Sequence, residues 1–108
     1  MPWRPISSFV PVVMSEAIPK PDSQTVPVIK KLFRLQWEEV QQKHVLLYPE
    51  GMVQLNQSAG EILKRCDGIQ SVQEITKDLE AAFNHKGLEP DVLSFLEIAH
   101  GQGWVEFR

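Results

Sequence analysis

The sequence predicts a small α+β domain in which a three-stranded antiparallel sheet is followed by three helices. Three short β-prone segments lie between residues 31 and 55, and three segments with helical spacing of apolar residues follow, between residues 56 and 101. Segregated strands and helices are typical of α+β rather than alternating α/β domains. The chain has 108 residues, which is enough for one hydrophobic core and too few for two.

The three predicted strands are short and lie close together in the sequence. Residues 31–37 are β-prone, and Phe33, Leu35 and Trp37 lie on one side of a period-2 pattern, which is typical of a strand with one buried face. The second predicted strand spans residues 44–48 and the third spans residues 52–55. The Pro-Glu-Gly sequence between them predicts a turn, because proline fixes φ and glycine accepts positive φ. The order of the strands in the sheet stays open.

Each predicted helix begins with a recognisable N-terminal signal. Asn56 and Ser58 are both candidate caps for the first helix, and Ser71 opens a Ser-x-x-Glu capping box for the second. Pro90 suits the first turn of the third helix, where a missing N–H costs nothing. Residues 104–107 alternate again and predict a terminal strand or an extended tail. The buried stripe expected for the third helix is Val92, Phe95, Leu96 and Ala99.

Residues 1–27 are predicted to be a disordered N-terminal extension, with the folded domain at residues 28–108. Six of the eight prolines lie in this extension, and no period of 2 or 3.6 residues is present among them. Met14 is a possible alternative start. Trp3 and Phe9 could form a docking motif, although an extension without structure is the simpler interpretation.

Composition excludes several classes of protein. The net charge of −3 argues against general binding to nucleic acid, which requires a surplus of Lys and Arg. No apolar run is long enough to span a membrane, and the apolar residues 9–14 are interrupted by Pro11, so we expect no signal peptide and a cytoplasmic protein. The single cysteine, Cys66, rules out an intramolecular disulfide and a multi-cysteine metal cluster.

The sequence offers no catalytic or cofactor signature. His44, His85 and His100 form no metal-binding pair, and phosphate-loop, GxSxG and dinucleotide motifs are all missing. Cys66 falls on the apolar face of its helix with no neighbouring base to activate its thiol. We therefore expect no enzymatic activity, no metal and no cofactor, and Cys66 catalysis is left as a minor alternative.

A DNA-binding winged helix is a further alternative, because it also combines three helices with a small sheet. In that fold the third helix usually enters the major groove and carries Arg or Lys. Here residues 89–102 contain no Arg or Lys and three acidic residues. This segment would repel DNA, so we expect no nucleic-acid partner.

Five motifs occur in a characteristic order. They are FRLQWE at residues 33–38, LLYPEGMVQLNQSAGEIL at 46–63, CDG at 66–68, VQEI at 72–75 and DVLSFLEIAHGQGWV at 91–105. Together they resemble the family of pyrroloquinoline quinone (PQQ) biosynthesis protein D, PqqD, over residues 30–107. The N-terminal extension is longer than family members usually carry.

The resemblance implies a winged-helix-like fold and a non-enzymatic peptide chaperone of the kind called a RiPP recognition element. Members of the family bind the precursor peptide PqqA and present it to PqqE, a radical S-adenosylmethionine enzyme. Related domains hold a leader peptide as an added strand on the third strand, beside the third helix. By this resemblance the peptide-binding residues are Met52, Val53, Gln54 and Leu55 on the strand, and Asp91, Leu93, Ser94 and Ile98 on the helix.

Three questions stay open at this level. Alternation puts Met52 and Gln54 on one face of the strand and Val53 and Leu55 on the other, without showing which face is buried. Either flank of the third helix could line the peptide groove. The precursor could belong to another modified-peptide pathway, and an exposed strand edge could also pair with a second copy to form a homodimer.

Overall fold

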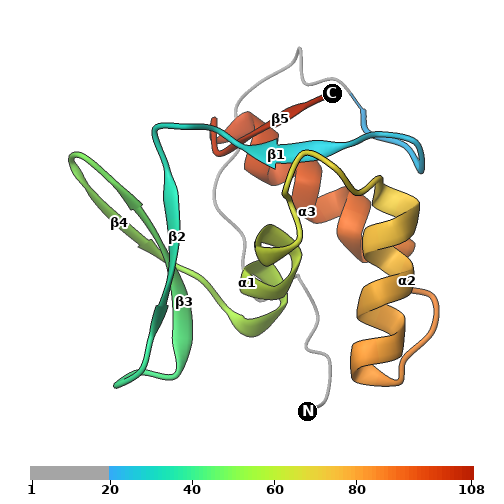
Figure 1. Ribbon diagram of the computed structural model, residues 1–108, viewed down its shortest axis with the longest axis horizontal. Helices are drawn as coiled ribbons and strands as arrows, with labels where there is room; N and C mark the ends of the chain where they lie inside the picture. Colours follow the sequence, from blue (N-terminus) through green and yellow to red (C-terminus); the bar gives the residue numbers. More distant parts are fainter. Residues whose placement is uncertain (1–19) are drawn as a thin grey trace.

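The computed structural model describes residues 20–108 as one domain (Figure 1). Along the chain the elements are β1, β2, β3, β4, α1, α2, α3 and β5. Figure 1 shows the sheet of β2, β3 and β4 at one side of the molecule and the helices at the other. This arrangement confirms the predicted α+β fold with a three-stranded sheet before three helices. Residues 1–19, which make up most of the predicted extension, lie outside the described residues.

The larger sheet is a meander of three strands, β2 (Arg34–Glu38), β3 (Lys43–Tyr48) and β4 (Gly51–Gln54). β3 lies in the middle and pairs antiparallel with both neighbours, so β2 and β4 are the edges. β2 starts later than the sequence predicts, because the N–H of Phe33 donates to the carbonyl of Lys30 at 3.0 Å in a preceding turn. The strand order that the sequence left open is therefore the order along the chain.

A second sheet of two strands closes the other end of the domain. β1 (Pro27–Ile29) pairs antiparallel with β5 (Val105–Phe107). β5 confirms the strand interpretation of the C-terminal segment, whereas β1 was not predicted. The pairing continues past both strands, since Val26 and Arg108 exchange backbone hydrogen bonds of 3.2 and 2.8 Å.

The segment before β1 packs on the start of the second helix. The carbonyls of Ser23 and Thr25 accept hydrogen bonds from the backbone N–H groups of Gln73 (3.0 Å) and Val72 (2.8 Å). These two donors belong to the first turn of a helix, which has no partners of its own for them. Backbone hydrogen bonds to the rest of the domain are therefore present as far upstream as Ser23, which precedes residue 28, the predicted start of the folded domain.

The first two helices begin at side-chain caps. For α1 (Gln57–Lys64) the cap is Asn56, whose Oδ1 accepts from the N–H of Ala59 at 2.8 Å. The structure thus selects Asn56 over the alternative Ser58, which is buried in the first turn. α2 (Val72–Phe83) has the predicted capping box, because Ser71 and Glu74 bond each other's backbone N–H through their side chains.

The third helix, α3 (Glu89–Gly101), begins with Pro90 in its first turn, as predicted. The loop before it is fixed by Glu80 of α2, whose carboxylate accepts from the N–H groups of Gly87 at 2.9 Å and Leu88 at 3.1 Å. This loop sets the direction in which α3 leaves α2. Figure 1 shows that α3 then runs towards the larger sheet, so its C-terminal half is the part nearer that sheet.

One hydrophobic core joins all these elements. The predicted stripe of α3 is fully buried, and Trp104 is 5% exposed, as expected for a packing residue. Leu46 is the residue of β3 that belongs to this core. Within residues 20–108 no helix is long and apolar enough to cross a membrane. The other large members of the core are Leu55, Ile62, Leu63, Val72, Ile75, Leu79, Leu88 and Val105.

Candidate functional site

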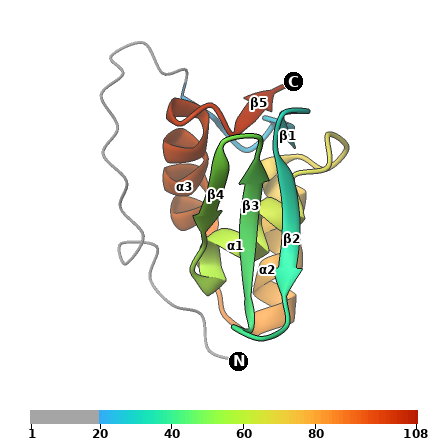
Figure 2. The ribbon, with the colours of Figure 1, turned by 90° about the vertical axis from the view of Figure 1, so that its left-hand side faces the viewer.

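The outer edge of β4 is open among the described residues, because β4 pairs with β3 alone there (Figure 2). Just past the strand, the N–H of Leu55 donates to the carbonyl of His44 at 3.1 Å, so Leu55 faces β3. Backbone groups alternate along an antiparallel ladder, so Val53 also faces β3. The N–H and C=O of Met52 and Gln54 therefore point outward, where an extended segment could pair with them.

The side chains of this strand divide between the core and the surface. Val53 is half-buried and packs on the core, and Leu55 is 2% exposed within it. Met52 is 55% exposed, and Gln54 is also exposed. The structure thus answers the question that alternation left open, because Val53 and Leu55 form the inward pair and Met52 and Gln54 the outward pair.

α3 lies on the same side of the molecule as the open edge. Seen with the larger sheet facing the viewer, the helix extends beyond β4, away from β3 and β2 (Figure 2). Its buried stripe faces the core, which leaves two flanks of the helix to be assigned. A peptide paired with β4 would have one of these flanks as its neighbour.

The four helix residues singled out from the sequence do not share one flank. Asp91, Ser94 and Ile98 are spaced by three and four residues, which places them together along one side of α3. Leu93 lies on the opposite flank and packs against the core. Ile98 is half-buried, yet it is not among the side chains that pack on the core cluster.

The flank that carries Leu93 is partly occupied by the smaller sheet. His100, two turns further along that flank, stacks on Phe107 of β5 with ring centroids 4.7 Å apart. This flank is therefore engaged within the domain, and the flank of Ile98 is the better candidate for an external contact.

The remaining chemistry of the described residues is limited. Burial raises the pKa of the Cys66 thiol to about 12, with a smaller contribution from the charge of Asp67. The thiol is thus protonated at neutral pH and 4% exposed. Within residues 20–108 no group of three or more His, Cys, Asp or Glu residues is placed to hold a metal ion.

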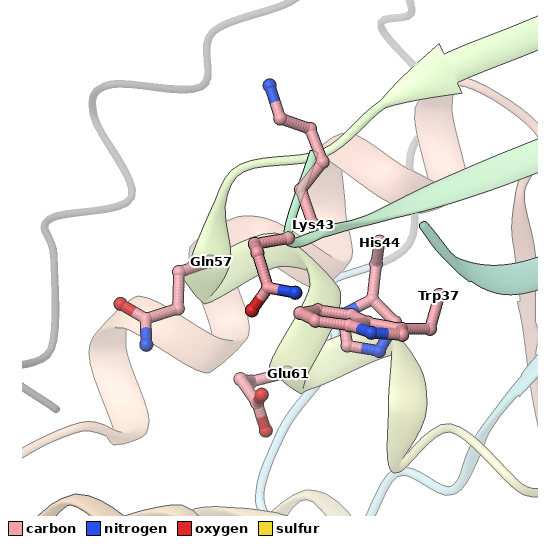
Figure 3. A pocket seen from close by; sticks show the side chains of 6 residues that line it. Trp37, Lys43, His44, Gln57 and Glu61 are labelled. Carbon is pink, nitrogen blue, oxygen red and sulfur yellow. The ribbon is translucent and has the colours of Figure 1, made fainter. Parts of the chain in front are cut away.

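A cavity of about 320 Å³ opens between α1 and the start of β3 (Figure 3). None of the site residues predicted from the sequence lines it. Sequence reasoning missed it, because its wall combines β2, the β2–β3 turn, β3 and α1. The one available signal was Trp37, an aromatic residue at the end of a strand whose neighbours are polar. The cavity is lined by Trp37, Gln42, Lys43, His44, Gln57 and Glu61.

The family model described as coenzyme PQQ synthesis protein D (PqqD) matches residues 43–105, more than half of the chain. The chain belongs to the PqqD family. It is 51% identical over 89 residues to the PqqA binding protein of Pseudomonas paraeruginosa, a match that covers 82% of this chain and 97% of that protein. It is 46% identical over 81 residues to the PqqA binding protein of Methylococcus capsulatus, covering 75% and 87% respectively.

A solved structure of the PqqD family has the same fold. It is the solution NMR structure of the PqqD truncation of Methylobacterium extorquens PqqCD, described as a functional and stand-alone RiPP recognition element. The two structures align with a TM-score of 0.65 and 32% sequence identity, covering 75% of this chain and 88% of the other. The match confirms both the family resemblance and the fold predicted from the sequence.

Proposed function

We propose that this protein recognises the precursor peptide PqqA in PQQ biosynthesis, by adding the peptide as a strand to the outer edge of β4. The observation that carries the proposal is this open edge, at which the backbone groups of Met52 and Gln54 point outward. The identity of the peptide is inferred from relatives that are named PqqA binding protein.

Backbone pairing supplies affinity, and neighbouring side chains supply specificity. Met52 and Gln54 flank the added strand on the solvent face of the sheet, where the thioether of Met52 can adapt to different side chains. Ile98 forms the wall on the α3 side, because it lies in the half of the helix nearer the sheet. Ser94 is exposed one turn before it and extends the same wall.

The other residues singled out from the sequence have supporting or more distant roles. Val53 and Leu55 hold β4 on the core, and Leu93 does the same for α3. They keep the strand and the helix at a fixed separation, which a peptide lying between them requires. Asp91 lies in the first turn of α3, at the end away from the larger sheet, so it would meet only a long peptide.

Strand addition is compatible with presentation of PqqA to the radical S-adenosylmethionine enzyme PqqE. β4 has four residues, so it holds a segment of only about 13 Å. The rest of a longer peptide stays free to enter the active site of a separate enzyme. In this proposal the protein supplies binding and position, and PqqE supplies the chemistry.

The proposal is tested by titrating synthetic PqqA into the isotope-labelled full chain and recording amide NMR spectra. We expect chemical-shift changes concentrated at residues 51–54 and in the C-terminal half of α3. Adding PqqE to the complex should broaden the amide signals of the labelled protein. Shifts confined to other elements, or no shifts at millimolar peptide, would reject strand addition at β4.

The same edge can pair with a second copy of the protein, because an unpaired strand accepts any extended segment. Such a homodimer would compete with PqqA for Met52 and Gln54. Sedimentation velocity with and without the peptide tests this competition. A dimer formed through β4 should dissociate into monomers when PqqA is added, whereas a protein that is already monomeric should stay monomeric.

A further inference from the structure

The cavity beside α1 brings a carboxylate and an aromatic ring to face the same space. Glu61 and Gln57 reach it from α1, and Trp37 and His44 reach it from the sheet (Figure 3). α1 and β3 are in close contact here, since a Cβ added to Gly60 would lie 2.7 Å from Nδ1 of His44. Both walls are thus regular elements of the fold, which makes the cavity a built feature of the domain.

The cavity wall carries one carboxylate, that of Glu61, and one ammonium group, that of Lys43. The guanidinium of Arg65 lies between two carboxylates, Glu61 at 2.8 Å and Asp78 at 2.6 Å, so these three groups together carry one net negative charge. Glu61 is largely shielded from solvent, with 17% of its side chain exposed. In Figure 3 the ammonium group of Lys43 points away from Glu61, and among the described residues no ion pair joins the two groups.

The imidazole of His44 adds no positive charge at neutral pH. Burial lowers its pKa below the ordinary value, with Glu61 acting in the opposite direction and Lys64 reinforcing the decrease. A neutral imidazole beside a carboxylate leaves the cavity suited to a cation. Glu61 would repel an acidic group and would offer a neutral group only a hydrogen bond.

Trp37 provides a second feature that favours cations. Its ring packs edge-on against His44 with centroids 4.9 Å apart, and its indole N–H donates to Glu39 at 2.8 Å. These two contacts fix the ring, yet 45% of the residue stays exposed. A fixed, exposed indole face attracts an ammonium or guanidinium group through its quadrupole, and it does so more strongly than the ring of Tyr or Phe.

We propose that this cavity binds a lysine or arginine side chain of the peptide that pairs with β4, an inference that rests on the function proposed above. The cavity starts where β4 ends: Leu55 is bonded to His44, and Gln57 is the first residue of α1. A peptide that runs along β4 and continues past Gln54 gains about 3.3 Å per residue. A basic residue a few positions beyond the paired segment can therefore reach Glu61 and Trp37.

The test is a double-mutant cycle measured by isothermal titration calorimetry with the full chain and synthetic PqqA. On the protein side the variants are Glu61→Gln and Trp37→Leu, and on the peptide side each lysine or arginine is replaced singly by glutamine. We expect Glu61→Gln to weaken binding of unmodified PqqA about tenfold, which is the effect of losing one shielded charge pair. The peptide that lacks the basic residue bound in the cavity should bind wild-type protein and Glu61→Gln with equal affinity.

Arg65→Gln is the matched control, because it breaks the same contact between α1 and α2 but leaves the charge of Glu61 at the cavity. If Glu61→Gln acted only by loosening the contact between α1 and α2, Arg65→Gln would weaken PqqA binding equally. We expect Arg65→Gln to keep or raise the affinity, because it leaves the carboxylate of Glu61 uncompensated. Trp37→Phe should recover part of the affinity lost in Trp37→Leu, since phenylalanine keeps an aromatic face.

The outcomes separate this inference from the proposed function. If PqqA binds and depends on the β4 edge, but Glu61→Gln and Trp37→Leu bind it normally, the cavity proposal fails and strand addition stands. Equal losses in Glu61→Gln and Arg65→Gln also overturn the cavity proposal. If wild-type protein does not bind PqqA at all, both proposals fall together.

Discussion

The two antiparallel sheets of this domain differ in what their strands face. In the smaller sheet, Pro27 and Val105 are buried, and β1 and β5 pair with each other at the point where both ends of the domain meet. In the larger sheet, Met52 and Gln54 are exposed, and β4 has an open edge among residues 20–108. The smaller sheet closes the fold, and the larger one offers unpaired backbone. Stability and binding are therefore expected to reside in different strands.

The largest expected effect comes from a charge placed in the smaller sheet. Val105→Asp puts a carboxylate at a position that is 0% exposed, and an unpaired buried charge costs several kcal/mol. We expect the domain to be largely unfolded at 25 °C, as measured by far-UV circular dichroism and urea titration. Glu106→Gln, at the exposed neighbouring position, should melt like wild type. A folded Val105→Asp protein would mean that the smaller sheet is dispensable.

Proline substitutions within β4 compare its two edges directly. Val53→Pro removes an N–H that faces β3, and losing this ladder hydrogen bond should cost about 1–3 kcal/mol of stability. Gln54→Pro removes an N–H on the open edge, where proline is tolerated, and should cost under about 1 kcal/mol while weakening PqqA binding about tenfold. Urea unfolding and calorimetry measure the two quantities. Small and equal effects on binding in two folded variants would count against the edge assignment.

Substitutions on the two flanks of α3 should also affect different quantities, one stability and the other peptide affinity, with smaller effects than in β4. Leu93→Ala removes a side chain that packs on the core and should cost about 1–2 kcal/mol of stability without a specific loss of peptide affinity. Ile98→Ala should lower PqqA affinity a few-fold at nearly unchanged stability. The reverse pattern would assign the peptide to the flank of Leu93.

The smallest expected effect is on the reactivity of the Cys66 thiol, which lies next to the smaller sheet. The carbonyl of Cys66 accepts a hydrogen bond from the N–H of Ile29 in β1 at 3.3 Å. With its pKa raised to about 12, the thiol is almost wholly protonated at pH 8 and should react with an aromatic disulfide only when the domain opens. Because the folded thiol has the higher pKa, its contribution to stability is present below pH ~8.5, the pKa of an unfolded thiol, and declines above it. Rapid labelling at pH 8 in the absence of urea would contradict this burial.

Local signals in the sequence predicted most of the elements. The Ser71 capping box, Pro90 in a first turn and the apolar stripe of α3 depend on neighbours within a few residues, so the chain itself specifies them. β1 could not be predicted, because its three residues form a strand only by pairing with β5, some eighty residues away. Long-range pairing leaves no period in so short a segment.

The candidate site was only partly predictable for the same reason. The family resemblance pointed to β4 and α3, yet the inward pair of β4 depends on the register that Leu55 and His44 fix across two strands. The two flanks of α3 became distinguishable only once His100 was seen stacked on Phe107. The cavity has no counterpart in any single segment, since Trp37 and Glu61 meet only after the sheet packs on α1.

The hydrogen bonds between Val26 and Arg108 have a consequence for how the domain can be engineered. The chain enters and leaves the fold at one place, so a host protein could carry the domain in a surface loop without separating the flanking residues of that loop. A circular permutant that joins Arg108 to the segment before β1 and opens at Lys86, in the exposed loop between α2 and α3, would keep both sheets intact. Such modules would let a peptide-recognition edge be placed beside a chosen modifying enzyme.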